Sequence, residues 1–286
     1  MSRGARLTGA LMLAAAAAPL AAQSQFSVRV ESVRVDVLVA DGGRPVLGLR
    51  ADDFEILDNG VPQQTDLVSF DEVPLNVILV LDISNSVAGE RLEQLQDAGR
   101  AVLTGLRKED QAALVTFSHV VSLGAALSKD LAAVRSALGA AYGFGETSLI
   151  DATYTAMMVG EADAGRALLI AFSDGVDTQS WLRADAVLDA AKRSDAVAYG
   201  AAIEARESSS FLRDLTSLTG GTTYKVESTR DLRQTFLKIL EEFRHRYLVS
   251  YTPRGVSKDG WHRIDVRVKN RRVTVKARPG YLAGTS

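Results

Sequence analysis

Hydrophobic residues alternate with polar ones near both ends of the chain, whereas the middle carries unbroken hydrophobic runs. Between residues 26 and 70, valines recur at every second position, as at Val33, Val35, Val37 and Val39. This period of two is typical of strands with one face exposed to water. The turn sequences "DGGRP" and "DNG" separate such stretches, and the second is a strong hairpin signal. We therefore expect a β-rich segment over residues 23–71, which is too small to be stable without a partner.

The middle of the chain, residues 72–245, alternates hydrophobic runs with amphipathic stretches. The runs predict strands at "LNVILVLD", "QAALVTFS", "RALLIAFSD", "AVAYGAAI" and "TTYKV", with a short edge strand at "VVSL". The amphipathic stretches predict helices over residues 90–106, 130–141, 148–159, 184–194, 209–218 and 231–244. Fully hydrophobic strands that alternate with helices indicate the α/β class: a doubly wound, mostly parallel sheet with helices on both faces.

Alternation returns after the last predicted helix, in "YLVSYTP", "WHRIDVRVKN" and "RRVTVKARPGY". Residues 246–286 are therefore expected to form antiparallel strands. Because each flank alone would leave a hydrophobic face uncovered, we expect these strands to pack with the N-terminal β-rich segment as one small β domain.

The first residues resemble a targeting signal. Arg3 and Arg6 precede "LTGALMLAAAAAPLAA", a hydrophobic run that ends in small residues. This pattern predicts a secretory signal peptide over residues 1–22, cleaved after Ala22. A retained membrane anchor is the competing interpretation, but the run is shorter than the roughly 20 residues that a spanning helix needs. We therefore expect an exported protein in the periplasm, the cell envelope or the extracellular space, and without cysteine it cannot form disulfides.

The charge balance disfavours some classes of partner. The net charge of −2 results from 33 basic and 35 acidic residues, so no global field favours nucleic acid or an anionic membrane. Basic residues gather only in "KNRRVTVKARPG", where they alternate with valines as on the exposed face of a strand.

The first candidate functional residues lie where the first buried strand ends. Asp82, Ser84 and Ser86 form D-x-S-x-S directly after "LNVILVL". In an extended loop, alternate side chains point the same way, so three oxygen groups can face one point and supply half of an octahedral shell for a cation such as Mg²⁺. The competing interpretation is that Ser86 caps the next helix.

Two later loops favour the metal. "GFGETSLIDAT" places Thr147 at the start of a predicted helix, and "LLIAFSDGVDT" places Asp174 after another buried strand. Because the carboxyl ends of parallel strands share one edge of the sheet, these loops and the D-x-S-x-S loop are expected to converge.

The set resembles the von Willebrand factor type A domain with its metal-ion-dependent adhesion site. "DISNS", the threonine of "GETSL" and the aspartate of "FSDG" match its three motifs in order and spacing, over roughly residues 72–245. The resemblance implies that Ser84, Ser86 and Thr147 contact a divalent cation directly or through water, and that Asp82 and Asp174 act through water or bind directly. It also implies Mg²⁺ as the metal, with Mn²⁺ or Ca²⁺ as alternatives. A Glu or Asp carboxylate of a partner protein would complete the metal's coordination shell, so the implied function is adhesion rather than catalysis.

Departures from the family pattern are few. Asn85 stands where glycine is common and Val87 where methionine is frequent, but neither is an expected ligand. Glu146 and Asp177 are additional acids in the loops, expected to be solvated, with binding of the ion as the alternative. Ser148 competes with its neighbour Thr147, which we favour because Leu149 completes the family's T-x-L pattern.

The flanks are similar to the ends of exported bacterial A-domain proteins that are abundant in acidobacteria. The similarity covers "VRVDVLVADGGRPVLGLRADDFEILDNGVPQ" before the A domain, and "YLVSYTP" with "GWHRIDVRVKNRRVTVKARPGYLA" after it. It implies a secreted or envelope-associated binding module and identifies no partner.

Enzymatic alternatives have weaker signals. His119, His245 and His262 are far apart in sequence, His119 is expected in an edge loop, and no G-x-S-x-G, P-loop or G-x-G-x-x-G motif occurs. A phosphotransferase of the haloacid dehalogenase type would need a second acid where Ser84 stands. Our hypothesis is a non-enzymatic, metal-dependent protein-binding module. A structural envelope module with a stabilising metal and a metal-dependent phosphatase are the alternatives.

Overall fold

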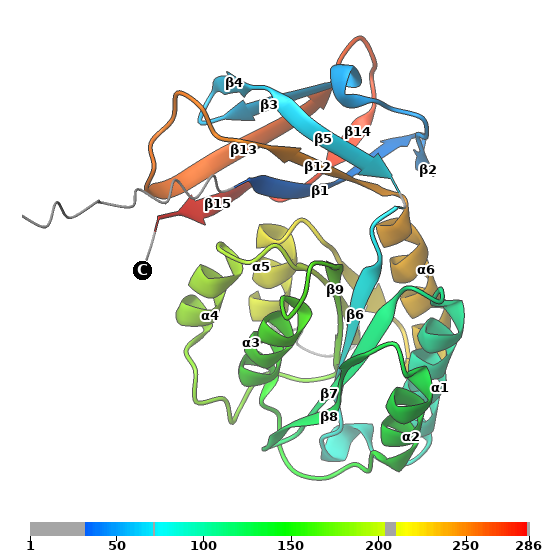
Figure 1. Ribbon diagram of the computed structural model, residues 1–286. Coiled ribbons are helices and arrows are strands. Elements are labelled where there is room, and N and C mark those ends of the chain that lie inside the picture. Colours follow the sequence, from blue (N-terminus) through cyan, green and yellow to red (C-terminus); the bar gives the residue numbers. More distant parts are fainter. Residues whose placement is uncertain (1–31, 71, 204–209, 285–286) are drawn as a thin grey trace, which may run out of the picture. The chain divides into compact units, whose positions relative to one another are not determined.

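The structure is a computed structural model that describes residues 32–70, 72–203 and 210–284 (Figure 1). The predicted signal peptide over residues 1–22 lies outside the described residues, as does the beginning of the N-terminal segment. Across the described ranges, we find no helix whose length and hydrophobicity would suffice to cross a lipid bilayer.

A six-stranded sheet carries the central part of the chain, with strand order β11-β10-β9-β6-β7-β8. Its strands are β6 (Leu75–Asp82), β7 (Gln111–Phe117), β8 (Val121–Ser128), β9 (Arg166–Ser173), β10 (Val197–Ile203) and β11 (Thr223–Val226). Neighbouring strands are parallel except β7 and β8, which form an antiparallel pair. Every residue of β6 and β9 is buried, as their unbroken hydrophobic sequences require. The predicted α/β class is confirmed.

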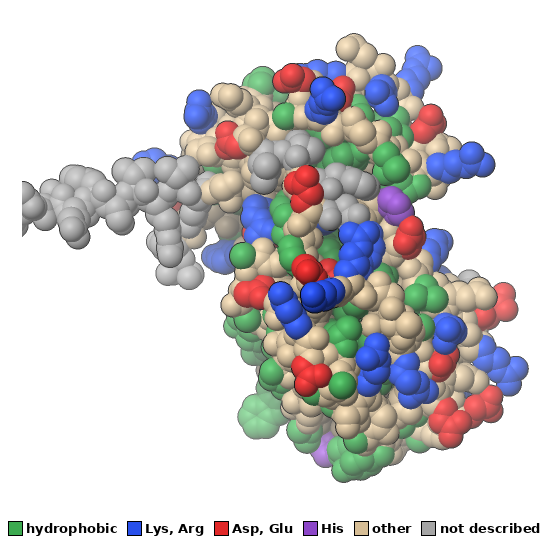
Figure 2. Space-filling model, turned by 45° about the vertical axis from the view of Figure 1, so that its right-hand side comes forward, with side chains coloured by type: hydrophobic (Ala, Val, Ile, Leu, Met, Phe, Trp, Pro, Cys, Tyr) green, Lys and Arg blue, Asp and Glu red, His purple; other side chains and the backbone are tan. Residues whose placement is uncertain are grey.

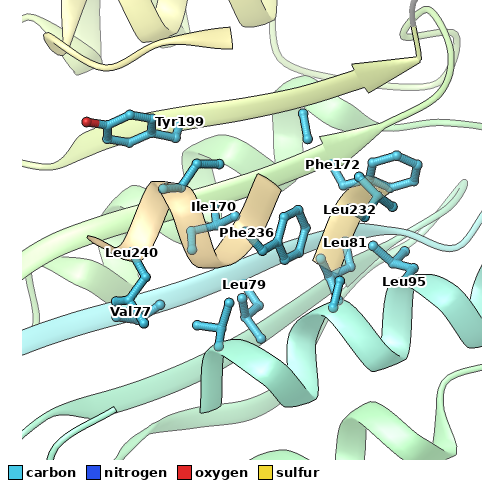
Figure 3. Packing of buried hydrophobic residues seen from close by; sticks show 14 of the residues in the cluster. Val77, Leu79, Leu81, Leu95, Ile170, Phe172, Tyr199, Leu232, Phe236 and Leu240 are labelled. Carbon is cyan, nitrogen blue, oxygen red and sulfur yellow. The ribbon is translucent and has the colours of Figure 1, made fainter. Parts of the chain in front are cut away.

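Six helices cover this sheet: α1 (Glu90–Gly105), α2 (Leu131–Ala140), α3 (Leu149–Gly160), α4 (Ala184–Ala191), α5 (Ser210–Leu218) and α6 (Leu232–Arg244). Residues of β6 alternate between two hydrophobic cores because successive side chains point to opposite faces. Val77, Leu79 and Leu81 pack with α1, α2 and α6 (Figure 3), whereas Ile78 and Val80 pack with α3, α4 and α5.

The boundaries of two elements differ from the prediction by more than one residue. The edge strand β8 is twice as long as "VVSL", since antiparallel pairing with β7 continues through "GAALS", whose small residues give only a weak strand signal. Helix α4 ends at Ala191 instead of residue 194. Its C-terminal region is fixed by tertiary contacts, because the guanidinium group of Arg278 donates to the carbonyls of Lys192 and Ser194, both at 2.8 Å.

Two further sheets combine strands from both flanks of the chain, in the orders β14-β1-β12-β5, with β2 on β1, and β15-β13-β3-β4. The N-terminal strands are β1 (Val33–Asp41), β2 (Arg44–Pro45), β3 (Phe54–Asp58), β4 (Val61–Gln63) and β5 (Thr65–Phe70). The C-terminal strands are β12 (Arg246–Tyr251), β13 (Gly260–Val268), β14 (Thr274–Lys276) and β15 (Gly280–Ala283).

Pairing between the flanks is antiparallel and extensive. β1 pairs with β12 from Val33 opposite Tyr251 to Leu38 opposite Arg246, and β3 pairs with β13. The expected hairpin at "DNG" joins β3 to β4, with positive φ angles of 48° and 82° at Asn59 and Gly60. The division of the chain into separate domains at residues 71 and 245 stays a prediction.

Buried arginines lie at the amino end of the central sheet. Arg166, the first residue of β9, forms a buried ion pair with Asp36 of β1, with 2.8 Å from Nε to Oδ1. Arg246 donates to the hydroxyl of Tyr199 at 3.0 Å and to the carbonyl of Gly220 at 2.6 Å. These bonds satisfy guanidinium groups that would be costly to bury without partners.

Candidate metal site

The candidate site forms at the carboxyl ends of β6 and β9. The two strands are parallel neighbours, with Leu81 opposite Phe172, so Asp82 at the end of one strand and Asp174 just after the other reach the same edge. Both side chains are buried, with 0% and 3% of their surface exposed.

Asp82 is held by two hydrogen bonds. Its Oδ1 accepts from the backbone N–H of Ser84 at 2.9 Å, and its Oδ2 accepts from the hydroxyl of Ser173 at 2.8 Å. Burial raises the pKa of Asp82 from the usual 3.8 to about 6, and the negative charge of Asp174 contributes to the rise, whereas the bonds from Ser84 and Ser173 oppose it. A cation at this point would favour the ionised carboxylate.

The two serines lie beside each other and join the two strand ends. The hydroxyl oxygens of Ser84 and Ser86 are 3.1 Å apart, and Ser86 donates to Oδ1 of Asp174 at 2.6 Å. The alternative that Ser86 caps the next helix is wrong. Gly89 occupies the N-cap position of α1, and the hydroxyl of Ser86 is directed to Asp174.

Thr147 lies against the loop that follows Asp174. It is 7% exposed, and its carbonyl accepts from the backbone N–H groups of Thr178 and Gln179 at 2.9 and 3.0 Å. A Cβ atom placed on Gly175 would lie 3.9 Å from its hydroxyl oxygen, so this oxygen faces the residue next to Asp174. Ser148 is also buried, and its hydroxyl makes no capping bond to α3. The choice between the two hydroxyls therefore stays a prediction.

Asn85 connects the serine loop to the threonine loop, a role that sequence analysis missed. Its N–H donates to the carbonyl of Gly145 at 3.0 Å, and its Oδ1 accepts from the N–H of Gly145 at 3.1 Å. Gly145 has a φ of +76°, and a Cβ atom there would lie 2.1 Å from Nδ1 of His119. His119 itself is exposed in the turn after β7, as predicted. The glycine that is common in the family at position 85 would lack the side-chain bond.

The two additional acids differ in their surroundings. Glu146 is exposed, as predicted. The prediction of a solvated side chain is wrong for Asp177, whose Oδ2 accepts from the N–H of Ile150 at 2.9 Å and from the hydroxyl of Ser180 at 2.6 Å. Asp177 thus satisfies a free N–H group in the first turn of α3, where a negative charge is also favourable.

Arg91 is a second residue that the sequence did not single out. It stands in the first turn of α1 with half of its side chain exposed. Its Nη1 lies 3.7 Å from Oδ2 of Asp174 and donates to the carbonyl of Ser86 at 2.9 Å. A positive charge therefore borders the site, and it opposes the binding of a cation.

The donor set fits a hard cation. Ser84, Ser86 and Thr147 offer hydroxyl oxygens, and Asp82 and Asp174 offer carboxylates. Mg²⁺ binds oxygen octahedrally at about 2.0–2.1 Å, which separates adjacent ligands by about 3 Å. The 3.1 Å between the serine hydroxyls matches two adjacent positions on one ion. Within the described ranges, no group of three or more His, Cys, Asp or Glu side chains could hold a metal ion, so this candidate site depends on hydroxyl oxygens beside its two carboxylates.

The curated relatives match a short stretch of the chain. Inter-alpha-trypsin inhibitor heavy chain H2 of Sus scrofa is 41% identical over 51 residues, and heavy chain H3 of Pongo abelii is 46% identical over 50 residues. Each match covers 18% of this chain and 6% of the relative's own length.

Solved structures share the fold at low sequence identity. A von Willebrand factor type A protein from Catenulispora acidiphila superposes with a TM-score of 0.54 and 12% identity, over 80% of this chain and 73% of that one. Proximal thread matrix protein 1 from the mussel byssus gives 0.52 with 14% identity, over 65% and 49% of the two chains. A further structure of that mussel protein has zinc in its metal-ion-dependent adhesion site and gives a TM-score of 0.51.

The family comparison covers the part of the chain that builds the central sheet and the candidate site. The model of the von Willebrand factor type A domain matches residues 76–238, more than half of the chain. This chain therefore belongs to the von Willebrand factor type A domain family.

Proposed function

We propose that this chain is an exported, metal-dependent protein-binding module. Asp82, Ser84, Ser86, Thr147 and Asp174 would hold a divalent cation, Mg²⁺ or alternatively Mn²⁺ or Ca²⁺, and a Glu or Asp carboxylate of a partner protein would complete its shell. The observation that carries the proposal is a pair of side-chain hydrogen bonds, one between Ser84 and Ser86 and one from Ser86 to Asp174. They join two loops at one buried edge of the sheet.

The residue types account for binding rather than catalysis. Three of the five donors are neutral hydroxyls, so a bound cation would keep much of its charge and could attract a carboxylate from outside. Ser173 and the N–H of Ser84 hold both oxygens of Asp82, and Ser86 holds Asp174, so the side chains are oriented before any ligand arrives. Domains of this family typically mediate protein interactions, and the mussel relative has a metal at its adhesion site.

The surface and the N-terminal sequence support the remaining parts of the proposal. Basic and acidic side chains are mixed over the face shown in Figure 2, so the charge on that face does not favour a polyanionic partner such as nucleic acid. Export to the periplasm, the envelope or the medium rests on the sequence of residues 1–22 alone.

Calorimetric titration of the purified protein with Mg²⁺ and Mn²⁺ tests the site. We expect saturable binding by the unaltered chain and its loss in Ser84→Ala. Ser217→Ala is the matched control, because Ser217 is an exposed serine on α5, and it should bind like the parent. Equal binding by the parent and Ser84→Ala would remove the proposed site.

Four of the five residues, all but the half-buried Ser86, are buried, and this also favours a second candidate, a metal that only stabilises the fold. In that case saturating Mg²⁺ raises the melting temperature, but the loaded protein binds no carboxylate. A glutamate-containing peptide that binds only in the presence of Mg²⁺ would decide for the binding module.

A further inference from the structure

A tryptophan stands exposed in one of the loops that build the candidate metal site. Trp181 is 95% exposed, more than any other large hydrophobic side chain in the described part of the chain. It lies between Asp174 and the start of α4, in a loop that also exposes Val176 and Leu182. Exposed hydrophobic residues that gather at one place mark sites of interaction, and tryptophan is among the residues that contribute most to binding energy.

The backbone that carries Trp181 is fixed by hydrogen bonds to the first turn of α3. The N–H groups of Trp181 and Leu182 donate to the two carboxylate oxygens of Asp151, both at 2.9 Å. In return, the N–H of Asp151 donates to the hydroxyl of Ser180 at 3.1 Å, and Ser180 is bonded to Asp177. The indole is therefore presented from an ordered backbone, which lowers the entropic cost of binding a ligand.

A groove beside Trp181 offers room for a ligand side chain. It has a volume of about 470 Å³. Beside Trp181, its lining includes His119, Val120, Ser148, Asp151, Tyr154 and Leu182. Val120, Tyr154, Trp181 and Leu182 are all more than a third exposed, so hydrophobic surface faces the solvent here. The carboxylate of Asp151 also lines the groove, but both of its oxygens already accept hydrogen bonds from the backbone N–H groups of Trp181 and Leu182.

The lining of the groove adjoins the candidate metal site at one residue. Ser148 in its lining directly follows Thr147, whose carbonyl accepts from the same loop that carries Trp181. On the other side, the ring of His119 packs edge-on against Phe144, 5.1 Å between centroids, in the loop that leads to Thr147. A chain bound at the metal site by one carboxylate thus has the groove beside it.

We propose that this groove binds a hydrophobic side chain of the same partner segment that supplies the carboxylate. The partner is a polypeptide in which a Glu or Asp is followed, within about four residues, by a bulky hydrophobic residue that packs on Trp181. Four residues of extended chain span about 13 Å. The proposal rests on the proposed function, because the metal site fixes the acidic end of the segment.

The test uses the full chain with Trp261→Phe, which leaves Trp181 as the single tryptophan. The probes are twelve-residue Gly/Ser peptides with one Glu, either alone or with Phe two, three or four residues after it. In Mg²⁺, we expect at least one Phe peptide to bind about tenfold or more tightly than the Glu-only peptide and to shift the Trp181 fluorescence to the blue. By calorimetry, Trp181→Ala should lose this difference and bind Mg²⁺ unchanged, whereas Leu47→Ala, at a hydrophobic residue 57% exposed elsewhere, should keep it.

Each failure has its own signature. Normal Mg²⁺ binding without any advantage for the Phe peptides, or with the same advantage in Trp181→Ala, would overturn the groove proposal and leave the metal site intact. No Mg²⁺ binding would overturn the proposed function and the groove proposal with it. A blue shift with phosphatidylcholine–phosphatidylglycerol vesicles or on self-association, in place of the peptides, would assign Trp181 to a lipid surface or to a second copy of the chain.

Discussion

The two ends of the central sheet both bury carboxylates, but they balance the charge in different ways. At the amino end, Asp36 pairs with Arg166, and Asp110 accepts from Arg244 at 2.6 Å and from two backbone N–H groups. At the carboxyl end, Asp82 is bonded to a hydroxyl and an N–H, with a second buried acid nearby. The basic side chain there, Arg91, is half exposed and 3.7 Å from Asp174.

The difference indicates which buried acids are structural. In the described part of the chain, the buried arginines are Arg166, Arg246 and Arg278, and all of them bond at the amino end or to the flanking strands. The chain thus provides its own cations at one end of the sheet. At the other end it gathers oxygen donors, whose charge the proposed cation would balance.

The largest effect is expected from breaking the pair at the amino end. Asp36→Asn leaves the guanidinium group of Arg166 buried without its counter-charge, which lowers the free energy of unfolding by about 3–5 kcal/mol. Urea denaturation measures the loss, and metal binding by the folded fraction should stay unchanged. Asp189→Asn, which removes an exposed pair with Lys192, is the control and should cost less than about 1 kcal/mol. Equal costs for the two variants would contradict the structural role of the buried pair.

The corresponding change at the carboxyl end should affect metal binding and spare the fold. Burial raises the pKa of Asp82 from 3.8 to about 6, so the cost of burying the ionised carboxylate is complete above about pH 6 and is lost as the pH falls from there toward 3.8. Asp82→Asn removes the charge and keeps groups able to bond Ser84 and Ser173. In EDTA at neutral pH, we expect no loss of stability, but calorimetry should show Mg²⁺ affinity reduced about 100-fold or more. A loss of several kcal/mol in EDTA would place Asp82 with the structural acids.

The smallest effect has the opposite sign. Arg91→Gln removes a positive charge beside Asp174, and we expect Mg²⁺ affinity to rise about three- to tenfold at low salt, with a smaller rise at high salt. Arg233→Gln is the matched control. It removes a half-exposed arginine of α6 that is paired with Asp97, and Asp97 lies on α1, the helix that also carries Arg91. If both variants change the affinity alike, general charge and not the position of Arg91 is responsible.

The sequence predicted those elements whose signal is local. "LNVILVLD" coincides with β6, and most helix ends lie within one residue of the prediction, because hydrophobic runs and amphipathic periods are written in consecutive residues. The length of α4 was wrong, since the contacts of Arg278 with its C-terminal region come from a residue more than 80 positions away.

Within the candidate site, motifs located the donors but not the groups that hold them. Asn85 acts through bonds to another loop and Asp177 through a bond to the first turn of α3. Trp181 is notable only for its exposure, which a sequence does not show. Outside the site, His262 is buried, and its Nδ1 lies 2.8 Å from Oδ1 of Asp58. The two residues are 204 positions apart, so the local sequence around His262 could not predict this pair. The metal itself stays a prediction.

The pairing of β5 with β12 has a consequence for the order of folding. Phe70 and Tyr247 are strand neighbours, yet the whole central sheet lies between them in sequence. Closing so long a loop of unfolded chain carries an entropic cost that grows with its length, and contacts of this kind form slowly. We therefore expect the central sheet to fold first, after which the flanking strands meet across a short gap instead of a long disordered loop.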